Sequence, residues 1–191
     1  MGIDQSLTNT GVVVIEDGKL IHKESIKIKK KGIMRLHMIC NKLEDIIKKY
    51  VPDIFVMEGY AYGSSMSRVF DLGELGGIIK IRIFNYYYNF DNPRNVTIAP
   101  FNNVFFIVPP TMLKKFVTGK GNCKKALMLL KIYKKWGIEF NDDNIADAFA
   151  LAKFIERYLQ SNAQEMYILK FTKTEEEIFK KYKKYRDENP I

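Results

Sequence analysis

Short apolar runs alternate with turn-forming residues in the first part of the chain, a pattern typical of β-strands. Ser6 to Thr10 and Asp17-Gly18 are turn-forming, so successive strands form antiparallel pairs. The next segment has apolar residues every three or four positions, which predicts a helix that Pro52 ends. A wholly apolar run follows and is typical of a central strand buried on both faces. We therefore predict three strands (1–5, 11–16 and 19–29), a helix (33–50) and a buried strand (54–57).

The rest of the chain predicts mainly helices. Residues 69–90 have helical periodicity but are apolar on more than one face, which fits a core helix or a subunit interface. The order of elements predicts an α/β fold, with a mixed five-stranded sheet flanked by helices in a domain spanning 1–160 and a C-terminal extension at 161–191. We further predict a strand (104–108), three helices (111–117, 124–136 and 142–159), an extension strand (166–171) and an amphipathic helix beginning at Thr174.

Composition excludes two classes of protein. Of the 191 residues, 47% are hydrophobic and 28% are charged, far from the composition of a disordered chain. No stretch has the 18 or so uninterrupted apolar residues that a membrane span needs, and the N-terminus lacks the pattern of a signal peptide. We expect a soluble, cytoplasmic protein, or one in the host cytoplasm or nucleoid if the source is viral. Cys40 and Cys123 match no zinc spacing and predict ordinary thiols.

The formal net charge of +9 is unevenly distributed along the chain. Between Asn102 and Ile138 there is no Asp or Glu. Lysine clusters of this kind neutralise phosphates and are typical of nucleic-acid binding, although a solvated lysine-rich surface would give the same pattern. The lysines of this segment are Lys114, Lys115, Lys120, Lys124, Lys125, Lys131, Lys134 and Lys135.

Four carboxylates fall where a mixed sheet would bring them together. Asp4 lies in the first predicted strand and Glu58 just beyond the buried one, while Asp143 and Asp147 lie one turn apart on one face of the last long helix. Crowded carboxylates select hard cations, Mg²⁺ with Mn²⁺ as a substitute. Two such ions about 4 Å apart are suited to phosphodiester hydrolysis. Singly, each residue also has an ordinary interpretation: Asp4 in a turn, Glu58 at a strand end, Asp143 as a helix cap.

Four motifs in order resemble the RuvC family of Holliday-junction resolvases, especially its phage and viral members. Gly2 to Ser6, followed by Thr10-Gly11, resembles the first catalytic strand of the family, and Met57 to Gly59 resembles its second acidic motif. Lys114 to Lys125 is similar to its basic K-x₄-G-x-G-x₃-K segment, and Ala146 to Ala152 to its terminal helix. The resemblance covers residues 1 to 160.

The resemblance implies an RNase H-like fold and a homodimer that cuts symmetric strands of four-way DNA junctions with Mg²⁺. It implies Asp4, Glu58 and Asp147 as catalytic metal ligands. The bacterial pattern has another aspartate three residues before the last one, where this chain has Asn144. Because i−3 and i−4 share a helix face, either Asn144 or Asp143 completes the site, and we favour Asp143 as a catalytic ligand.

The resemblance also implies a DNA-binding surface and a dimer helix. Lys125 is placed near the scissile phosphate, where it would stabilise developing charge. Aromatic residues after Glu58 lie where the family inserts side chains at the junction crossover, with an ordinary capped turn as the alternative. Residues 69–90 correspond to the family's dimer helix, with a plain core helix as the alternative. The residues expected to bind DNA are Lys114, Lys115, Lys120, Lys124, Lys125, Tyr60 and Tyr62.

Three functions remain open from the residues. The first is a metal-dependent endonuclease that resolves branched DNA. The second is another RNase H-like nuclease, acting on flaps, branches or RNA, and the third is a non-catalytic junction-binding protein in which Asn144 marks a degraded site. An actin-like ATPase is disfavoured, because the chain lacks the length for two lobes and a second glycine-rich phosphate loop.

Overall fold

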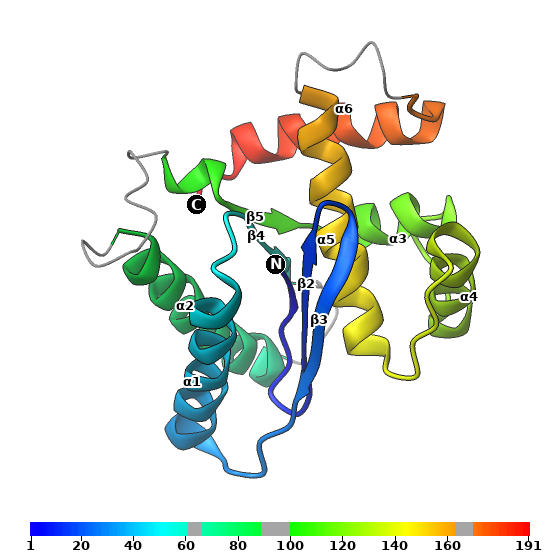
Figure 1. Cartoon of the computed structure of the whole chain (residues 1–191). Helices are drawn as coiled ribbons and strands as arrows, with labels where there is room; N and C mark the ends of the chain where they lie inside the picture. The colour runs from blue at the N-terminus through cyan, green and yellow to red at the C-terminus, as the bar shows by residue number, and fades with distance from the viewer. Residues whose placement is uncertain (61–65, 89–99, 163–169) are drawn as a thin grey trace.

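The computed structural model describes residues 1–60, 66–88, 100–162 and 170–191 (Figure 1). The predicted extension strand at 166–171 and the end of the predicted 69–90 helix lie largely outside these ranges. The elements are β1 (Gly2–Asp4), β2 (Thr10–Glu16), β3 (Lys19–Ile26), α1 (Gly32–Tyr50), β4 (Phe55–Glu58), α2 (Met66–Tyr88), a 3₁₀ turn (Phe101–Asn103), β5 (Phe105–Val108), α3 (Pro110–Thr118), α4 (Lys125–Trp136), α5 (Asp143–Asn162) and α6 (Lys173–Glu188).

The five strands form one mixed sheet in the order β3-β2-β1-β4-β5. The antiparallel pairs β1–β2 and β2–β3 come from the tight turns of the N-terminal segment. The parallel pair β4–β5 has α2 in its connection, whereas the chain passes from β1 through β2, β3 and α1 to β4, the parallel partner of β1. The predicted α/β class and mixed five-stranded sheet are confirmed.

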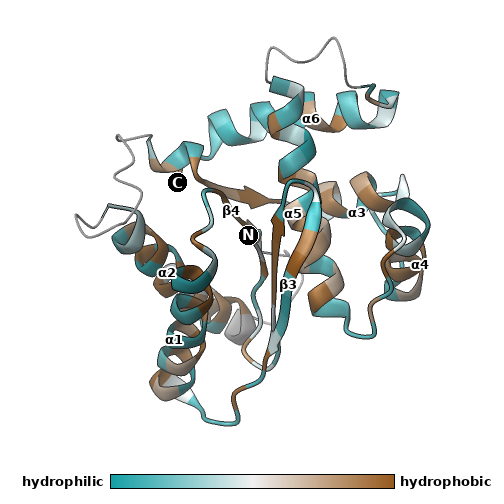
Figure 2. Ribbon diagram, in the orientation of Figure 1, coloured by the Kyte–Doolittle hydropathy of each residue, from teal (hydrophilic) through white to brown (hydrophobic). Residues whose placement is uncertain are grey.

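Two hydrophobic cores lie on the two faces of the sheet. Alternate residues of one strand supply both, since Val12 and Val14 pack under α1 and α2 while Val13 packs under α5. The strands are accordingly hydrophobic between the two helical layers (Figure 2). The second core also contains residues of α3, α4 and α6, so the C-terminal helix shares the core of the domain.

Two predicted boundaries differ from the structure for reasons that its contacts explain. The third strand ends at Ile26 and not at residue 29, because its partner β2 begins at Thr10, which pairs with Ile26. The last helix is capped by Thr172 and not by Thr174. The Thr172 hydroxyl accepts a hydrogen bond from the Glu175 N–H at 3.1 Å, and the Thr172 N–H donates to the Glu175 carboxylate at 3.0 Å.

Cys40 and Cys123 are free thiols, as predicted. Within the described ranges, none of the helices combines the length and apolarity needed to cross a bilayer.

Candidate active site

Asp4 and Glu58 are the last residues of two neighbouring parallel strands. Ile3 of β1 pairs with Met57 of β4, so the next residue of each strand lies at the same edge of the sheet. Glu58 is the final residue of β4, not a residue just beyond it. Asp4 is only 8% exposed. The sheet therefore brings two carboxyl groups together at one end of the molecule.

Helix α5 lies directly on β1 and β2 and adds two more carboxylates. A side chain at Gly2 would collide with the Ala148 carbonyl, and one at Gly11 with the Asn144 carbonyl. This close approach requires glycine at both strand positions. It sets the first turns of α5, which carry Asp143 and Asp147, beside the strand ends.

The carboxyl groups raise one another's pKa. Burial raises the pKa of Asp4 well above its usual value, and the charges of Glu58 and Asp147 raise it further. Burial, then the charge of Asp147, raises the pKa of Glu58 to about 7. Burial, then the charge of Asp143, raises the pKa of Asp147 to about 6. Raised pKa values in neighbouring carboxyl groups indicate that the positive charge nearby is too small to neutralise them.

Two lysines face these carboxylates. Lys125, the first residue of α4, donates a hydrogen bond from Nζ to the Asp143 carboxylate at 2.8 Å. Lys114 of α3 opposes the rise in the pKa values of Glu58 and Asp147. A pocket of about 160 Å³ lies between these groups. Its lining includes Glu58, Pro110, Lys114, Cys123, Lys125, Met128, Leu129, Asp143, Ala146 and Asp147.

Asn144 turns away from this pocket. Its side-chain amide donates to the Asp142 carboxylate at 3.2 Å, and Asp142 also caps α5 by accepting the Asn144 and Ile145 N–H groups. Of the two residues left open by the sequence, Asp143 faces Lys125 and lines the pocket, and Asn144 does neither.

Asp142 is a structural residue of the site that sequence reasoning missed. Its second carboxylate oxygen accepts hydrogen bonds from Asn9 at 3.0 Å and from Ser25 at 2.9 Å. These bonds join the start of α5 to the β1–β2 turn and to β3. Burial tends to raise the pKa of Asp142, but the hydrogen bonds from Asn9 and Ser25, together with those from the Asn144 and Ile145 N–H groups, outweigh it and bring the pKa to about 2. No local sequence pattern indicates that Asp142 contacts Asn9 and Ser25, because these residues are far apart along the chain.

Other predicted site residues lie further out. Lys115 pairs with Glu177 of α6 at 3.5 Å and does not line the pocket. Lys120 and Lys124 are exposed on the turn before α4. The Tyr60 hydroxyl lies against Gly76 of α2, next to the Gln5 amide. Tyr62 lies outside the described residues.

Gln5 is a second residue that the sequence did not single out. Its amide nitrogen donates to the Glu58 carbonyl at 3.4 Å, and its Oε1 is buried without a hydrogen-bond partner in the described structure.

The donor set is one of hard oxygen ligands. In the described part of the chain, no three His, Cys, Asp or Glu side chains converge closely enough to hold one ion as they stand. The chemistry of the set nevertheless fits a divalent cation, because a cation would neutralise the three carboxyl groups whose pKa values are raised.

Comparison with known proteins points to one family. The family model for the crossover junction endodeoxyribonuclease RuvC matches residues 1–154. The RuvC protein of Carboxydothermus hydrogenoformans is 28% identical over 160 residues, covering 80% of this chain and 91% of that protein. RuvC of Campylobacter hominis is 24% identical over 159 residues, covering 80% of this chain and 91% of that protein.

Solved structures share the fold. Thermus thermophilus RuvC superposes with a TM-score of 0.65 at 19% identity, covering 84% of this chain and 95% of that chain. The same protein in complex with a Holliday junction gives a TM-score of 0.59 at 20% identity, covering 79% of this chain and 88% of that chain. The yeast mitochondrial Holliday junction resolvase gives 0.51 at 13% identity, covering 97% of this chain and 80% of that one.

Proposed function

The chain belongs to the RuvC family of crossover junction endodeoxyribonucleases, and from this premise we propose that it resolves four-way DNA junctions by hydrolysing phosphodiester bonds. The observation that supports this most directly is the cluster of Asp4, Glu58 and Asp147, whose raised pKa values reflect burial and mutual repulsion beside two lysines. We propose the lysine-rich loop and α4 surface around the pocket as the DNA contact, with Tyr60 and Tyr62 flanking the junction centre.

The family is one of divalent-metal-dependent nucleases. We propose that the ion is Mg²⁺, with Mn²⁺ as a substitute and two ions per site, held by Asp4, Glu58, Asp147 and Asp143. When bound, such ions supply a nucleophilic water and charge stabilisation at the phosphate. The Lys125–Asp143 ion pair would open as Asp143 becomes a ligand.

The lysines have a separate role in this proposal. Lys114 and Lys125 flank the pocket from α3 and α4. Their ammonium groups would orient the scissile phosphate and stabilise the negative charge that develops on it.

Asp143→Asn is expected to weaken the apparent affinity for Mg²⁺ about 10- to 100-fold, a loss typical of a perturbed metal site. Asn144→Ala should change that affinity less than threefold, because the Asn144 side chain contacts Asp142 and not the pocket. Titration of cleavage rate against Mg²⁺ concentration distinguishes the two. Equal effects of both substitutions would show that Asp143 is not the fourth metal ligand.

We also propose a homodimer formed through α2. Phe70, Ile81 and Phe84 are exposed at helical spacing on this helix. Gly73 and Gly77 lie one turn apart, and a side chain at either would meet only open space. Small residues on an exposed apolar helix face let a second helix approach closely.

Ile81→Arg is expected to shift the protein from dimer to monomer in sedimentation at micromolar concentration, since a charge would be buried in an apolar contact. The matched control is Ile33→Arg. Ile33 lies on α1, is 71% exposed and is not part of the proposed interface. A dimer that survives Ile81→Arg would place the interface elsewhere.

The alternative functions are separated by substrate choice. Matched four-way junctions, flaps, duplexes and single strands are incubated with the protein and Mg²⁺. Cleavage restricted to the junction supports the proposal. Equal cutting of flaps and forks would indicate a general debranching nuclease, and tight binding without cutting would indicate a recognition protein.

A further inference from the structure

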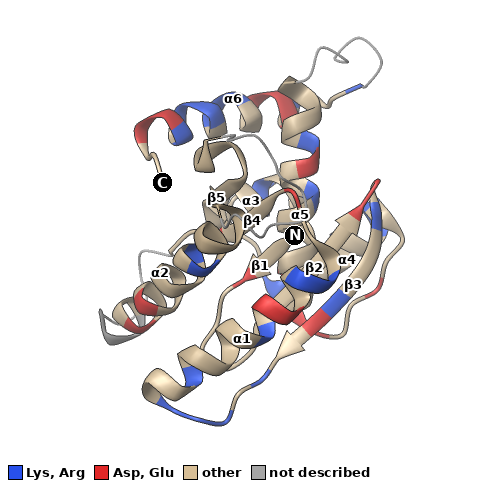
Figure 3. Cartoon of the chain, turned by 60° about the vertical axis from the view of Figure 1, so that its left-hand side comes forward, with Lys and Arg blue, Asp and Glu red and all other residues tan. Residues whose placement is uncertain are grey.

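Helix α6 lies beyond residues 1–154, the part of the chain that the family model matches. It crosses the C-terminal half of α5 and contacts α3 (Figure 1 and Figure 3). Its buried face consists of Glu175, Ile178, Phe179 and Tyr182. The Tyr182 hydroxyl donates to the carbonyl of Ile107 in β5 at 3.0 Å, and its ring packs edge-on against Phe154. These contacts fix α6 against α5 and β5.

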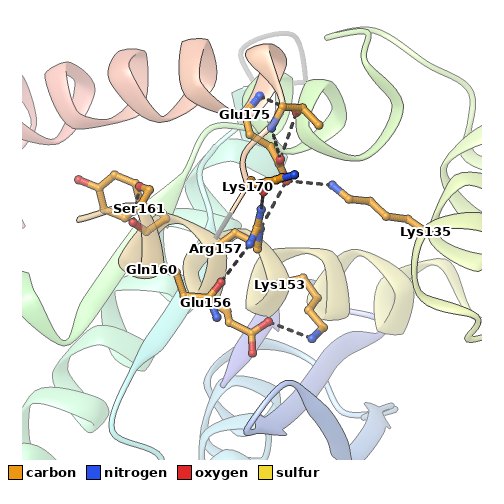
Figure 4. Close-up of polar contacts among 10 residues, drawn as sticks. Lys135, Lys153, Glu156, Arg157, Gln160, Ser161, Lys170 and Glu175 are labelled. Atoms are coloured by element: carbon orange, nitrogen blue, oxygen red, sulfur yellow. Dashed lines mark hydrogen bonds and ion pairs between the residues drawn. The ribbon is translucent and has the colours of Figure 1, made fainter. Parts of the chain in front are cut away.

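Glu175 is the charged centre of this contact. Its carboxylate is 6% exposed and lies 3.4 Å from Nζ of Lys135 in α4 and 3.6 Å from Nε of Arg157 in α5. Figure 4 shows Lys135 and Arg157 reaching it from two different helices. Burial tends to raise the pKa of Glu175, but the Thr172 N–H and the two cations outweigh it and lower the pKa. One carboxylate thus joins three helices.

Lys135 is itself fixed by aromatic rings. Its Nζ lies 4.1 Å from the centre of the Phe116 ring of α3 and 4.9 Å from that of Trp136. Phe116 in turn packs edge-on against Phe154 of α5 and near Phe179 of α6. Glu175 therefore acts on both α3 and α4 through Lys135.

The same two helices carry the lysines of the candidate active site. Lys114 directly precedes Lys115, which pairs with Glu177 of α6. Lys125 is the first residue of α4, and Lys135 lies in the last turn of the same helix. Helix α3 consequently lies between the pocket on one side and α6 on the other. A tilt of α3 or α4 would move Lys114 or Lys125 relative to the carboxylates.

We propose that α6 is a brace for the lysine-bearing helices, and that Glu175 is a positioning residue that holds Lys114 and Lys125 over the carboxylates of α5 and the sheet. The link to catalysis rests on the proposed function, whereas the brace itself does not.

The test uses Glu175→Gln in the full-length protein. Glutamine retains the capping box, so α6 keeps its N-terminal cap while the charge facing Lys135 and Arg157 is lost. Glu176→Gln is the matched control, with the same charge change in the same turn at an exposed position. Lys135→Met tests the contact from the other side and keeps an apolar chain over Phe116.

Hydrogen exchange of the metal-free protein is the first measurement. We expect Glu175→Gln and Lys135→Met to speed exchange at least fivefold in α3 and α4 and to leave α1 unchanged. Exchange equal to that of Glu176→Gln, or faster everywhere in the chain, would overturn the brace. This readout holds whether or not the protein cleaves DNA.

Cleavage kinetics are the second measurement. We expect Glu175→Gln to lower kcat about 5- to 20-fold with junction affinity within twofold, and the double variant with Lys135→Met to be no slower than the slower single variant. Additive losses, or a loss of affinity with unchanged kcat, would overturn the positioning role. Absence of cleavage by the unmodified protein would refute the proposed function and leave the exchange result to decide the brace.

Discussion

Asp4→Asn is expected to lower the rate of junction cleavage about 10³-fold or more, with junction affinity within a few-fold of the original. Asp4 is the most deeply buried carboxylate of the cluster, and its charge interacts with both Glu58 and Asp147. Removing one ligand charge costs several kcal/mol of transition-state stabilisation, and each 1.4 kcal/mol or so is tenfold in rate. Binding depends mainly on lysines and phosphates, which this substitution leaves in place.

Single-turnover cleavage and gel-shift titration measure the two effects separately. Asp45→Asn, on the exposed side of α1, is the matched control and should cleave normally. Loss of junction binding in Asp4→Asn, or cleavage within tenfold of the original, would remove Asp4 from the catalytic group.

The carboxyls of Glu58 and Asp147 are expected to destabilise the metal-free protein increasingly as the pH rises from about 4 to about 7. The N-terminal amine acts in the opposite direction, because burial lowers its pKa from 8.0 to about 5, so the contribution of the carboxyls is measured against a variant. The pKa of Glu58 rises from 4.5 to about 7 and that of Asp147 from 3.8 to about 6 on folding. In this window the folded state retains protons that the unfolded state has lost, so deprotonation favours unfolding. Each pKa unit corresponds to about 1.4 kcal/mol, which gives a loss on the order of 3 kcal/mol for Glu58 alone.

Thermal unfolding of the unmodified protein and of Glu58→Gln at pH 5 and pH 8 in a chelator measures this loss. We expect the Tm difference between the two proteins to grow by about 5–10 °C from pH 5 to pH 8. Glu58→Gln should gain stability relative to the unmodified protein as the pH rises and should have the higher Tm at pH 8, since it removes a charge that folding disfavours. Glu139→Gln, an exposed change, should do neither. A Tm difference that does not grow from pH 5 to pH 8, or a Glu58→Gln variant that is less stable than the unmodified protein at pH 8, would show that folding does not raise the pKa of Glu58.

The positions of Asp4 and Glu58 at strand ends could be predicted from the sequence because they follow from the pattern of apolar residues. Asp4 and Glu58 each end an apolar run, and parallel strands bring their carboxyl ends to one edge. Helical spacing likewise placed Asp143 and Asp147 on one face. The mixed sheet itself follows from two tight turns and a helical crossover.

Contacts between distant segments could not be predicted in the same way. Asn144 and Asp143 are equivalent on a helix diagram, and the choice depends on Asp142, whose side chain binds Asn144, Asn9 and Ser25. The predicted start of α6 is wrong because Thr172 and Thr174 both precede a glutamate by three residues, so the sequence pattern fits either cap. Burial of Glu175 between Lys135 and Arg157 decides for Thr172.

The most direct test of the central claim is cleavage of an end-labelled four-way junction with and without Mg²⁺, with a duplex of matched sequence as the control. The account predicts paired nicks at symmetric positions of two strands, with Mg²⁺ and on the junction alone. Tight junction binding without nicks in either Mg²⁺ or Mn²⁺ would contradict it and would make the carboxylate cluster a feature without catalytic use.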